Sequence, residues 1–143
     1  MTTQNSVNIG ITLGDSSDVY TNPADSATIA NAAVTTVDAT ASRALDTTYT
    51  NANAARSILV MATIRCVATL GAGNAYVQAK ADTSAPPTTV VSGLVGIQSG
   101  LLNEDNTYQI CFVVPAGTNQ NYRIDSSVTN GTTTLHKWFE YTL

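Results

Sequence analysis

Charged residues are scarce in this chain. They make up 11% of the 143 residues, against roughly 25% in an average soluble domain. Threonine, alanine, asparagine, serine and valine take their place, so hydroxyl and amide groups must solubilise the surface. Lysine and arginine number 6 and aspartate and glutamate 10, which gives a formal net charge of −4. Without an excess of basic side chains to displace phosphate counterions, the sequence argues against a nucleic-acid partner.

Long apolar segments are also missing. Residues 1–6 are polar and uncharged and no apolar stretch follows them, so we expect no standard secretory signal and folding in a cytoplasm. The longest apolar run, residues 57–69, is far shorter than the roughly 20 residues of a membrane-spanning helix, so no membrane insertion is expected. The two cysteines, Cys66 and Cys111, lie in strand patterns and too far apart for a metal knuckle. We expect both to be buried free thiols in neighbouring strands.

Residues that usually carry catalysis are few. The one histidine, His136, lies in the pattern of the last strand, and the sequence has no nucleophile elbow, phosphate loop or paired-histidine metal motif. Carboxylates occur in loose loop groups, of which Glu104 and Asp105 are the tightest. A solvated turn is a simpler interpretation of that pair than a calcium loop. The sequence therefore predicts no enzyme, no catalytic residue, no cofactor and no metal site.

The chain does contain one strong strand pattern, at residues 57–69. One face of this run is apolar throughout and consists of Ile58, Val60, Ala62, Ile64, Cys66 and Ala68. The other face begins with Leu59 and Met61 and is a mixture of polar and apolar residues further on. Such alternation with β-branched residues predicts a strand. Because a sandwich buries only one face of a strand, Leu59 and Met61 need cover, either from a neighbouring copy or from a loop or the N-terminal segment of the same chain.

Similar short patterns, separated by turn residues, occur along the rest of the chain, at 7–13, 45–50, 75–81, 89–98, 106–114, 122–127 and 132–143. The dipeptide Asn130-Gly131 is the strongest hairpin signal. Residues 24–43 are an alanine, threonine and aspartate mixture in which helix and strand compete. We therefore predict an all-β protein, an antiparallel β-sandwich of the jelly-roll kind formed by residues 45–143. Residues 1–44 are expected to be an extended N-terminal arm, with a short strand, for attachment or oligomerisation.

Aromatic side chains gather in the second half of the chain. Four of them fall at alternate positions and are expected in the core: Tyr108, Phe112, Phe139 and Tyr141. Trp138 falls on the other face of its strand, so we expect it at the surface. There it would either anchor a subunit interface, together with Leu59 and Met61, or stack on a sugar ring. In the second alternative, Glu140 and Asn130 would supply further glycan contacts.

Several short motifs point to a known class of domain. They are Thr-Thr-Tyr-Thr-Asn at 47–51, Val-Val-Pro-Ala-Gly at 113–117, Asn-Tyr-Arg-Ile at 121–124 and Trp-Phe-Glu at 138–140. With these motifs, the last two-thirds of the chain resemble the small β-sandwich domains of tailed-bacteriophage and prophage virion proteins, which often lie at the distal ends of tail fibres. Typical members end near Trp-Trp-Glu, and Phe139 stands at the second tryptophan here.

The resemblance implies a non-enzymatic homotrimer on the surface of a virion, made in the cytoplasm of a bacterial host. We expect a capsid decoration (cement or head-fibre) protein or a tail-fibre component. Its N-terminal part would dock on the major capsid or tail proteins, and the sandwich would be the displayed knob. The alternative is a receptor module of a tail fibre that binds a host surface glycan. An enzyme such as a depolymerase is the weakest hypothesis.

Overall fold

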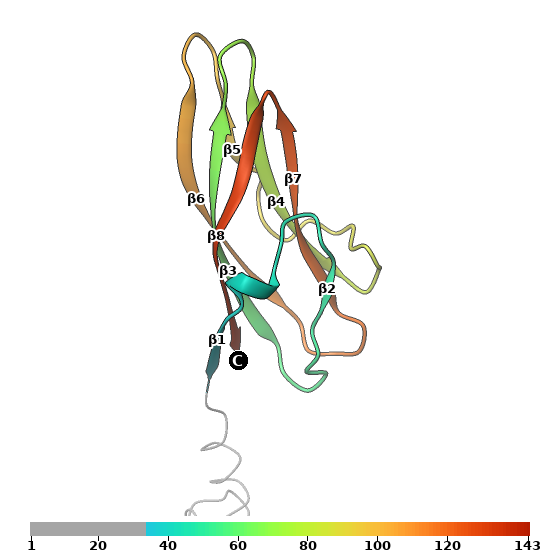
Figure 1. Cartoon of the computed structure of the whole chain (residues 1–143). Coiled ribbons are helices and arrows are strands. Elements are labelled where there is room, and N and C mark those ends of the chain that lie inside the picture. The colour runs from blue at the N-terminus through green and yellow to red at the C-terminus, as the bar shows by residue number, and fades with distance from the viewer. Residues whose placement is uncertain (1–33) are drawn as a thin grey trace, which may run out of the picture. The chain divides into compact units, whose positions relative to one another are not determined.

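Eight strands and one short 3-10 turn form the framework of residues 34–143, the part of the chain that this computed structural model describes (Figure 1). The elements are β1 (Thr35–Asp38), η2 (Thr40–Ser42), β2 (Tyr49–Thr50), β3 (Ile58–Ala68), β4 (Asn74–Asp82), β5 (Val95–Gln98), β6 (Glu104–Val114), β7 (Asn121–Thr129) and β8 (Gly131–Thr142). The predicted strand at 7–13 and most of the predicted arm lie outside the described residues. Among the described residues, no helix is long and apolar enough to cross a membrane.

The strands form two sheets of four. Sheet A has the order β1-β8-β3-β6 and sheet B the order β2-β7-β4-β5, and all neighbouring strands are antiparallel. Apart from the β4–β5 connection, every connection passes from one sheet to the other. This is the strand order of a jelly roll. The prediction of an all-β antiparallel sandwich is therefore confirmed.

The central strand of sheet A is the predicted one. β3 alternates between buried and more exposed positions along its whole length, and its apolar face points into the sandwich. Val60, Ile64 and Cys66 have no exposed surface. Their inward partners from the other strands include Ala75, Val77, Ala79, Ile97, Ile110, Phe112, Val114, Tyr122 and Ile124. The core thus lies between the two sheets.

A bulge in β8 reverses the predicted faces of its second half. Thr63 of β3 pairs with Lys137 but the next residue, Ile64, pairs with Leu135, so His136 has no partner across the pair. One extra residue on one strand moves all later side chains to the opposite face. Consequently Trp138 points into the core, where it has no exposed surface, and the predictions for Trp138 at the surface and for Phe139 and Tyr141 in the core were wrong.

The sandwich also begins earlier than residue 45. Residues 35–38, which the sequence analysis assigned to the arm, pair with β8 as strand β1. The chain then makes the η2 turn and crosses to sheet B, where β2 pairs with β7 (Figure 1). The compact unit of the described chain starts at Val34.

The predicted hairpin at Asn130-Gly131 is a different kind of turn. Because β7 belongs to sheet B and β8 to sheet A, these two residues connect the layers and do not join paired strands. The Thr69 amide donates a hydrogen bond to the Asn130 carbonyl over 2.8 Å. A Cβ atom on Gly131 would lie 2.3 Å from the carbonyl oxygen of Val67. Glycine is therefore needed here for close backbone approach.

Candidate functional site

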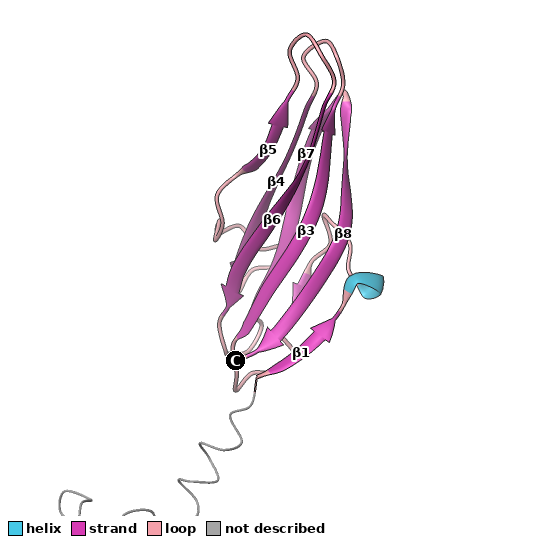
Figure 2. Cartoon of the chain, turned by 90° about the vertical axis from the view of Figure 1, so that its left-hand side faces the viewer, coloured by secondary structure: helices cyan, strands magenta, loops and turns pink. Residues whose placement is uncertain are grey.

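The outer face of sheet A carries a group of apolar side chains that we call the apolar strip. Figure 2 looks onto this face, with β6, β3 and β8 side by side. The register places two rows of three residues across these strands: Val113, Leu59 and Tyr141, then Cys111, Met61 and Phe139. Side chains at directly paired positions of neighbouring strands contact one another. The strip is therefore continuous across three strands.

No residue of the strip is buried within the described chain. Val113 is 47% exposed and Cys111 is also exposed, and the other four side chains are half-buried. The sequence analysis predicted an apolar start to the outer face of β3 at Leu59 and Met61, and the structure places both there. Of the two sources of cover left open, no loop within residues 34–143 buries them. The N-terminal segment lies outside the described residues.

Polar side chains bound the strip toward the middle of the sheet. The next row after Met61 consists of Gln109, Thr63 and Lys137. Beyond it, Arg65 Nε donates to Asp105 Oδ1 over 2.9 Å. The outer face thus divides into an apolar half and a polar half. The apolar half is at the end of the sheet where the chain ends, marked C in Figure 2.

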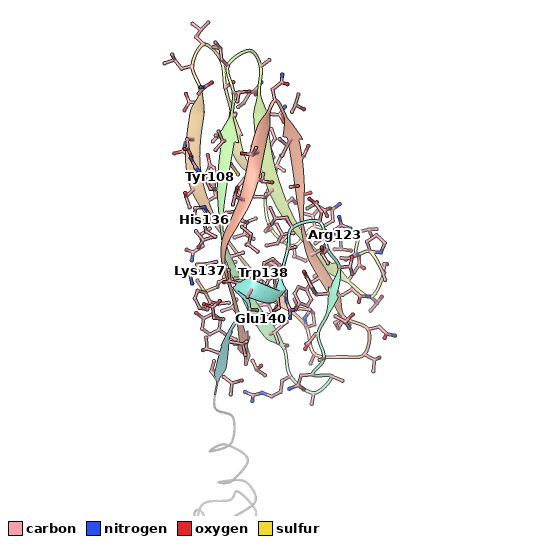
Figure 3. The ribbon with its side chains drawn as sticks, in the orientation of Figure 1. Tyr108, Arg123, His136, Lys137, Trp138 and Glu140 are labelled. Carbon is pink, nitrogen blue, oxygen red and sulfur yellow. The ribbon has the colours of Figure 1, made fainter. Side chains whose placement is uncertain are left out.

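Trp138 contributes nothing to this surface. Its ring is completely buried, and its Nε1 donates a hydrogen bond to Glu140 Oε1 over 2.9 Å. In Figure 3, Trp138 and Glu140 lie beside the η2 turn, and His136 and Lys137 lie on the preceding part of β8. A buried ring offers no area to a partner subunit and no face to a sugar. The expected roles of Trp138 as interface anchor and as glycan contact therefore do not fit the structure.

Glu140 is instead the centre of an internal hydrogen-bond network. Its carboxylate accepts from Arg43 Nε and from the Tyr122 hydroxyl, each over 2.8 Å, and from Trp138. The Arg43 guanidinium also lies 4.4 Å from the centre of the Tyr49 ring. These contacts fix the segment between β1 and β2 against both sheets. The sequence analysis missed this network, because Arg43 and Glu140 are 97 residues apart and no local pattern joins them.

The electrostatics of this network favour an ionised Glu140. Burial raises the pKa of the carboxyl group, but the hydrogen bonds from Arg43, Tyr122 and Trp138 and the Arg43 charge together bring the pKa below its usual value. Burial, and then the hydrogen bond to Glu140, raise the pKa of the Tyr122 hydroxyl. Arg43, Tyr122 and Trp138 all donate hydrogen bonds to Glu140. We therefore interpret the network as one that stabilises the fold.

The three residues expected to bind a glycan are not brought together. Asn130 is exposed, at the start of β8, whereas Glu140 is near the other end of that strand. Ten strand residues span about 30 Å at about 3.3 Å per residue. A single sugar cannot reach both, and Trp138 between them faces the core.

Other candidate groups are also dispersed. Within residues 34–143, no three histidine, cysteine, aspartate or glutamate side chains gather as metal ligands would. His136 is exposed in the bulge, as expected for a surface imidazole. Cys66 is a buried free thiol, and burial raises its pKa. The expectation of burial was wrong for Cys111, which is exposed because it alternates with the inward-facing Ile110 and Phe112.

Comparison with known proteins gives no match: no family model, no curated protein and no solved structure is similar to this chain. The functional argument therefore starts from the surfaces of the chain itself. Of these, the apolar strip is the one that the sequence analysis had singled out, through Leu59 and Met61.

Proposed function

We propose that this protein is a non-enzymatic structural component of a virion surface, and that it forms a homotrimer through the apolar strip. The observation that carries the proposal is the strip itself, six apolar side chains from three neighbouring strands without a charge among them. The location on a virion and the trimeric state are what the resemblance of residues 47–143 to phage virion domains implies. Made in a bacterial cytoplasm, the protein would act as a capsid decoration or tail-fibre component.

A second copy of the chain is the partner that best suits the strip. The solvent face of an antiparallel sheet is normally polar, and burial of apolar surface stabilises association by roughly 25 cal/mol per Å². Since the strip carries no charge, copies of it can meet without electrostatic repulsion. Lys137 and the Arg65–Asp105 pair remain outside the contact, where their hydration is preserved.

The edge of sheet A supports the same arrangement. β6 is 11 residues long and no described strand pairs with its outer edge. Its charges, Glu104 and Asp105, are both at its start, away from the strip. Long exposed edges invite uncontrolled pairing. A neighbouring subunit placed over the strip would also cover the adjoining part of this edge.

The proposal gives the two ends of the sandwich different tasks. The strip lies at the end where β8 and the chain finish, while the β3–β4, β5–β6 and β7–β8 connections lie at the opposite end (Figure 1). Assembly would use the first end, and the N-terminal part of the chain that precedes β1 would dock on the major capsid or tail proteins. The opposite loops would then face outward.

Sedimentation velocity tests this proposal. We expect the full chain to sediment as a trimer at micromolar concentration. Val113→Asp should shift it to monomer, because a carboxylate in the strip would lose its hydration on assembly. The matched control is Gln109→Asp, on the same face of the same strand but in the polar half, and it should remain trimeric.

Circular dichroism and melting of both variants separate assembly from folding. Val113 is 47% exposed, so we expect the monomeric Val113→Asp variant to keep its strand signal. A wild-type chain that sediments only as a monomer would refute the proposal. So would a Val113→Asp variant that stays trimeric.

A further inference from the structure

The outer face of sheet B carries a shallow polar depression of about 390 Å³, on the opposite side of the sandwich from the apolar strip. Its lining consists of Asp46, Tyr76, Gln78, Lys80, Leu94, Arg123, Asp125, Ser126 and Ser127. The outward residues of β4 and β7 form its floor as three cross-strand pairs: Tyr76 with Ser127, Gln78 with Asp125, and Lys80 with Arg123. Figure 3 shows Arg123 on this side of the molecule, away from His136 and Lys137.

The charges of the depression neutralise one another. Lys80 Nζ lies 2.7 Å from Asp125 Oδ2, and Arg123 forms an ion pair with Asp125 and lies 3.7 Å from Asp46. Two basic and two acidic side chains leave no net charge. A ligand that binds here is therefore not selected by charge, which argues against a phosphate, a polyanion or a metal ion.

One wall of the depression is held in place before any ligand binds. The Asp46 carboxylate accepts hydrogen bonds from the Ser126 amide over 2.8 Å and from the Ser126 hydroxyl. The Asp46 amide in turn donates to the Ile124 carbonyl over 2.9 Å. A wall fixed in this way lowers the entropy that a ligand would lose on binding.

Neutral hydrogen-bonding groups remain available on the floor. In the part of the chain that the structure describes, the Gln78 amide and the Ser127 hydroxyl have no hydrogen-bond partner. Both flank the half-buried ring of Tyr76, Ser127 across the strand pair and Gln78 two residues along β4. Leu94, which is 59% exposed, adds a second apolar contact to the lining. The Gln78 amide, the Ser127 hydroxyl and the Tyr76 ring thus all line the depression.

We propose that this depression binds a neutral saccharide. The apolar C–H face of a sugar ring would lie on Tyr76 and Leu94, as aromatic rings with polar neighbours favour. Its hydroxyls would exchange hydrogen bonds with Gln78 and Ser127, because an amide and a hydroxyl each both donate and accept. The inference does not rest on the assembly proposed above, and it uses none of Trp138, Glu140 or Asn130.

Affinity electrophoresis of the full chain tests the site. Gels would contain a neutral glucan, mannan or galactan, with polygalacturonate as the charged probe. We expect retardation by at least one neutral polysaccharide and none by polygalacturonate. Tyr76→Ser and Gln78→Ala should weaken binding about tenfold, while Tyr76→Phe, which keeps the ring, should bind as the wild type does.

The matched control is Gln109→Ala, the same substitution on the outer face of the other sheet, and it should leave retardation unchanged. Melting curves of all variants check that the fold is retained, since Tyr76 and Gln78 are both half-buried. No retardation by any of the three neutral polysaccharides would overturn the proposal. Equal retardation of the wild type and Gln78→Ala, or binding to the polygalacturonate gel alone, would also overturn it.

Discussion

The carboxylate of Glu140 accepts hydrogen bonds from three side chains on three different parts of the fold: Arg43 between β1 and β2, Tyr122 on β7 and Trp138 on β8. Removal of this acceptor would leave a half-buried guanidinium, a buried indole N–H and a buried hydroxyl unsatisfied. Each such loss costs free energy because the group was taken out of water on folding. The network therefore makes the β1–β2 segment part of the sandwich.

We expect Glu140→Ala to lower the free energy of unfolding by about 2–4 kcal/mol, as the loss of one partner in a buried charged network does. Urea unfolding followed by tryptophan fluorescence measures this directly, since Trp138 is the one tryptophan. The control is Glu104→Ala, an exposed glutamate at the start of β6, which should change stability by less than about 0.5 kcal/mol. Equal effects of the two substitutions would contradict a structural role for the network.

The pKa of Glu140 also predicts a dependence of stability on pH. Because its folded-state pKa lies below the ordinary value of 4.5, the stabilisation is fully present above pH 4.5 and is lost as the pH falls through the folded-state pKa. Urea unfolding between pH 7 and about pH 3 should therefore show a steeper loss of stability for the wild type than for Glu140→Gln. Parallel curves would show that Glu140 does not titrate with folding.

These contacts could not be predicted from the sequence. The position of Leu59 and Met61 on the outer face of β3 was predictable, since both belong to a regular two-residue repeat. Arg43 and Glu140, in contrast, meet only after two sheets have packed. Nothing local in the segment 24–43, where helix and strand propensities compete, indicates that Arg43 lies over the Tyr49 ring.

Among the elements, β3 and β8 show what a repeat does and does not reveal. β3 follows its alternation for 11 residues without a break, so its inward and outward faces could be predicted. β8 contains a bulge residue, His136, that has no partner on β3. Because the residues around it are mostly polar, the sequence does not show that the inward-facing positions shift by one there. The prediction failed for Trp138, Phe139 and Tyr141 because an alternating pattern carries no mark of an inserted residue.

Deletion of His136 tests this explanation. Without the extra residue, Leu135 and Lys137 become neighbours opposite Ile64 and Thr63, and the strand alternates without a break. Every other side chain then keeps its face, so we expect the deletion variant to fold to a stable sandwich. The substitution His136→Ala keeps the bulge and should change stability by less than about 0.5 kcal/mol. Circular dichroism and thermal melting compare the two. A deletion variant that does not fold would contradict the account of the bulge.

In the molecule as a whole, the fold class was predictable while the connection between layers was not. Roughly regular turns between short alternating segments already predict a sandwich. The turn at Asn130-Gly131 has the sequence of a hairpin yet joins the two sheets, because Gly131 allows the chain to pass close to Val67. The depression on sheet B was not predicted, since its polar residues alternate with core residues and resemble any solvated face.

The two outer faces of the sandwich thus differ in chemistry. Sheet A presents apolar side chains in its half of the molecule near the chain end, and sheet B presents mutually paired charges around Tyr76 and Gln78. Assembly through the first face would leave the second accessible. Under the two proposals above, this separation would let the protein be part of a particle and contact a saccharide at the same time.

The reactivity of Cys111 tests the self-association of the apolar strip most directly. Cys111 is exposed in a single copy and lies within the strip, whereas Cys66, the other cysteine, is buried in the core and serves as an internal control. We predict that a maleimide labels Cys111 slowly at concentrations where the protein is assembled and rapidly after dilution to monomer, with Cys66 unlabelled until the chain unfolds. Rapid labelling of Cys111 at every concentration would contradict the account.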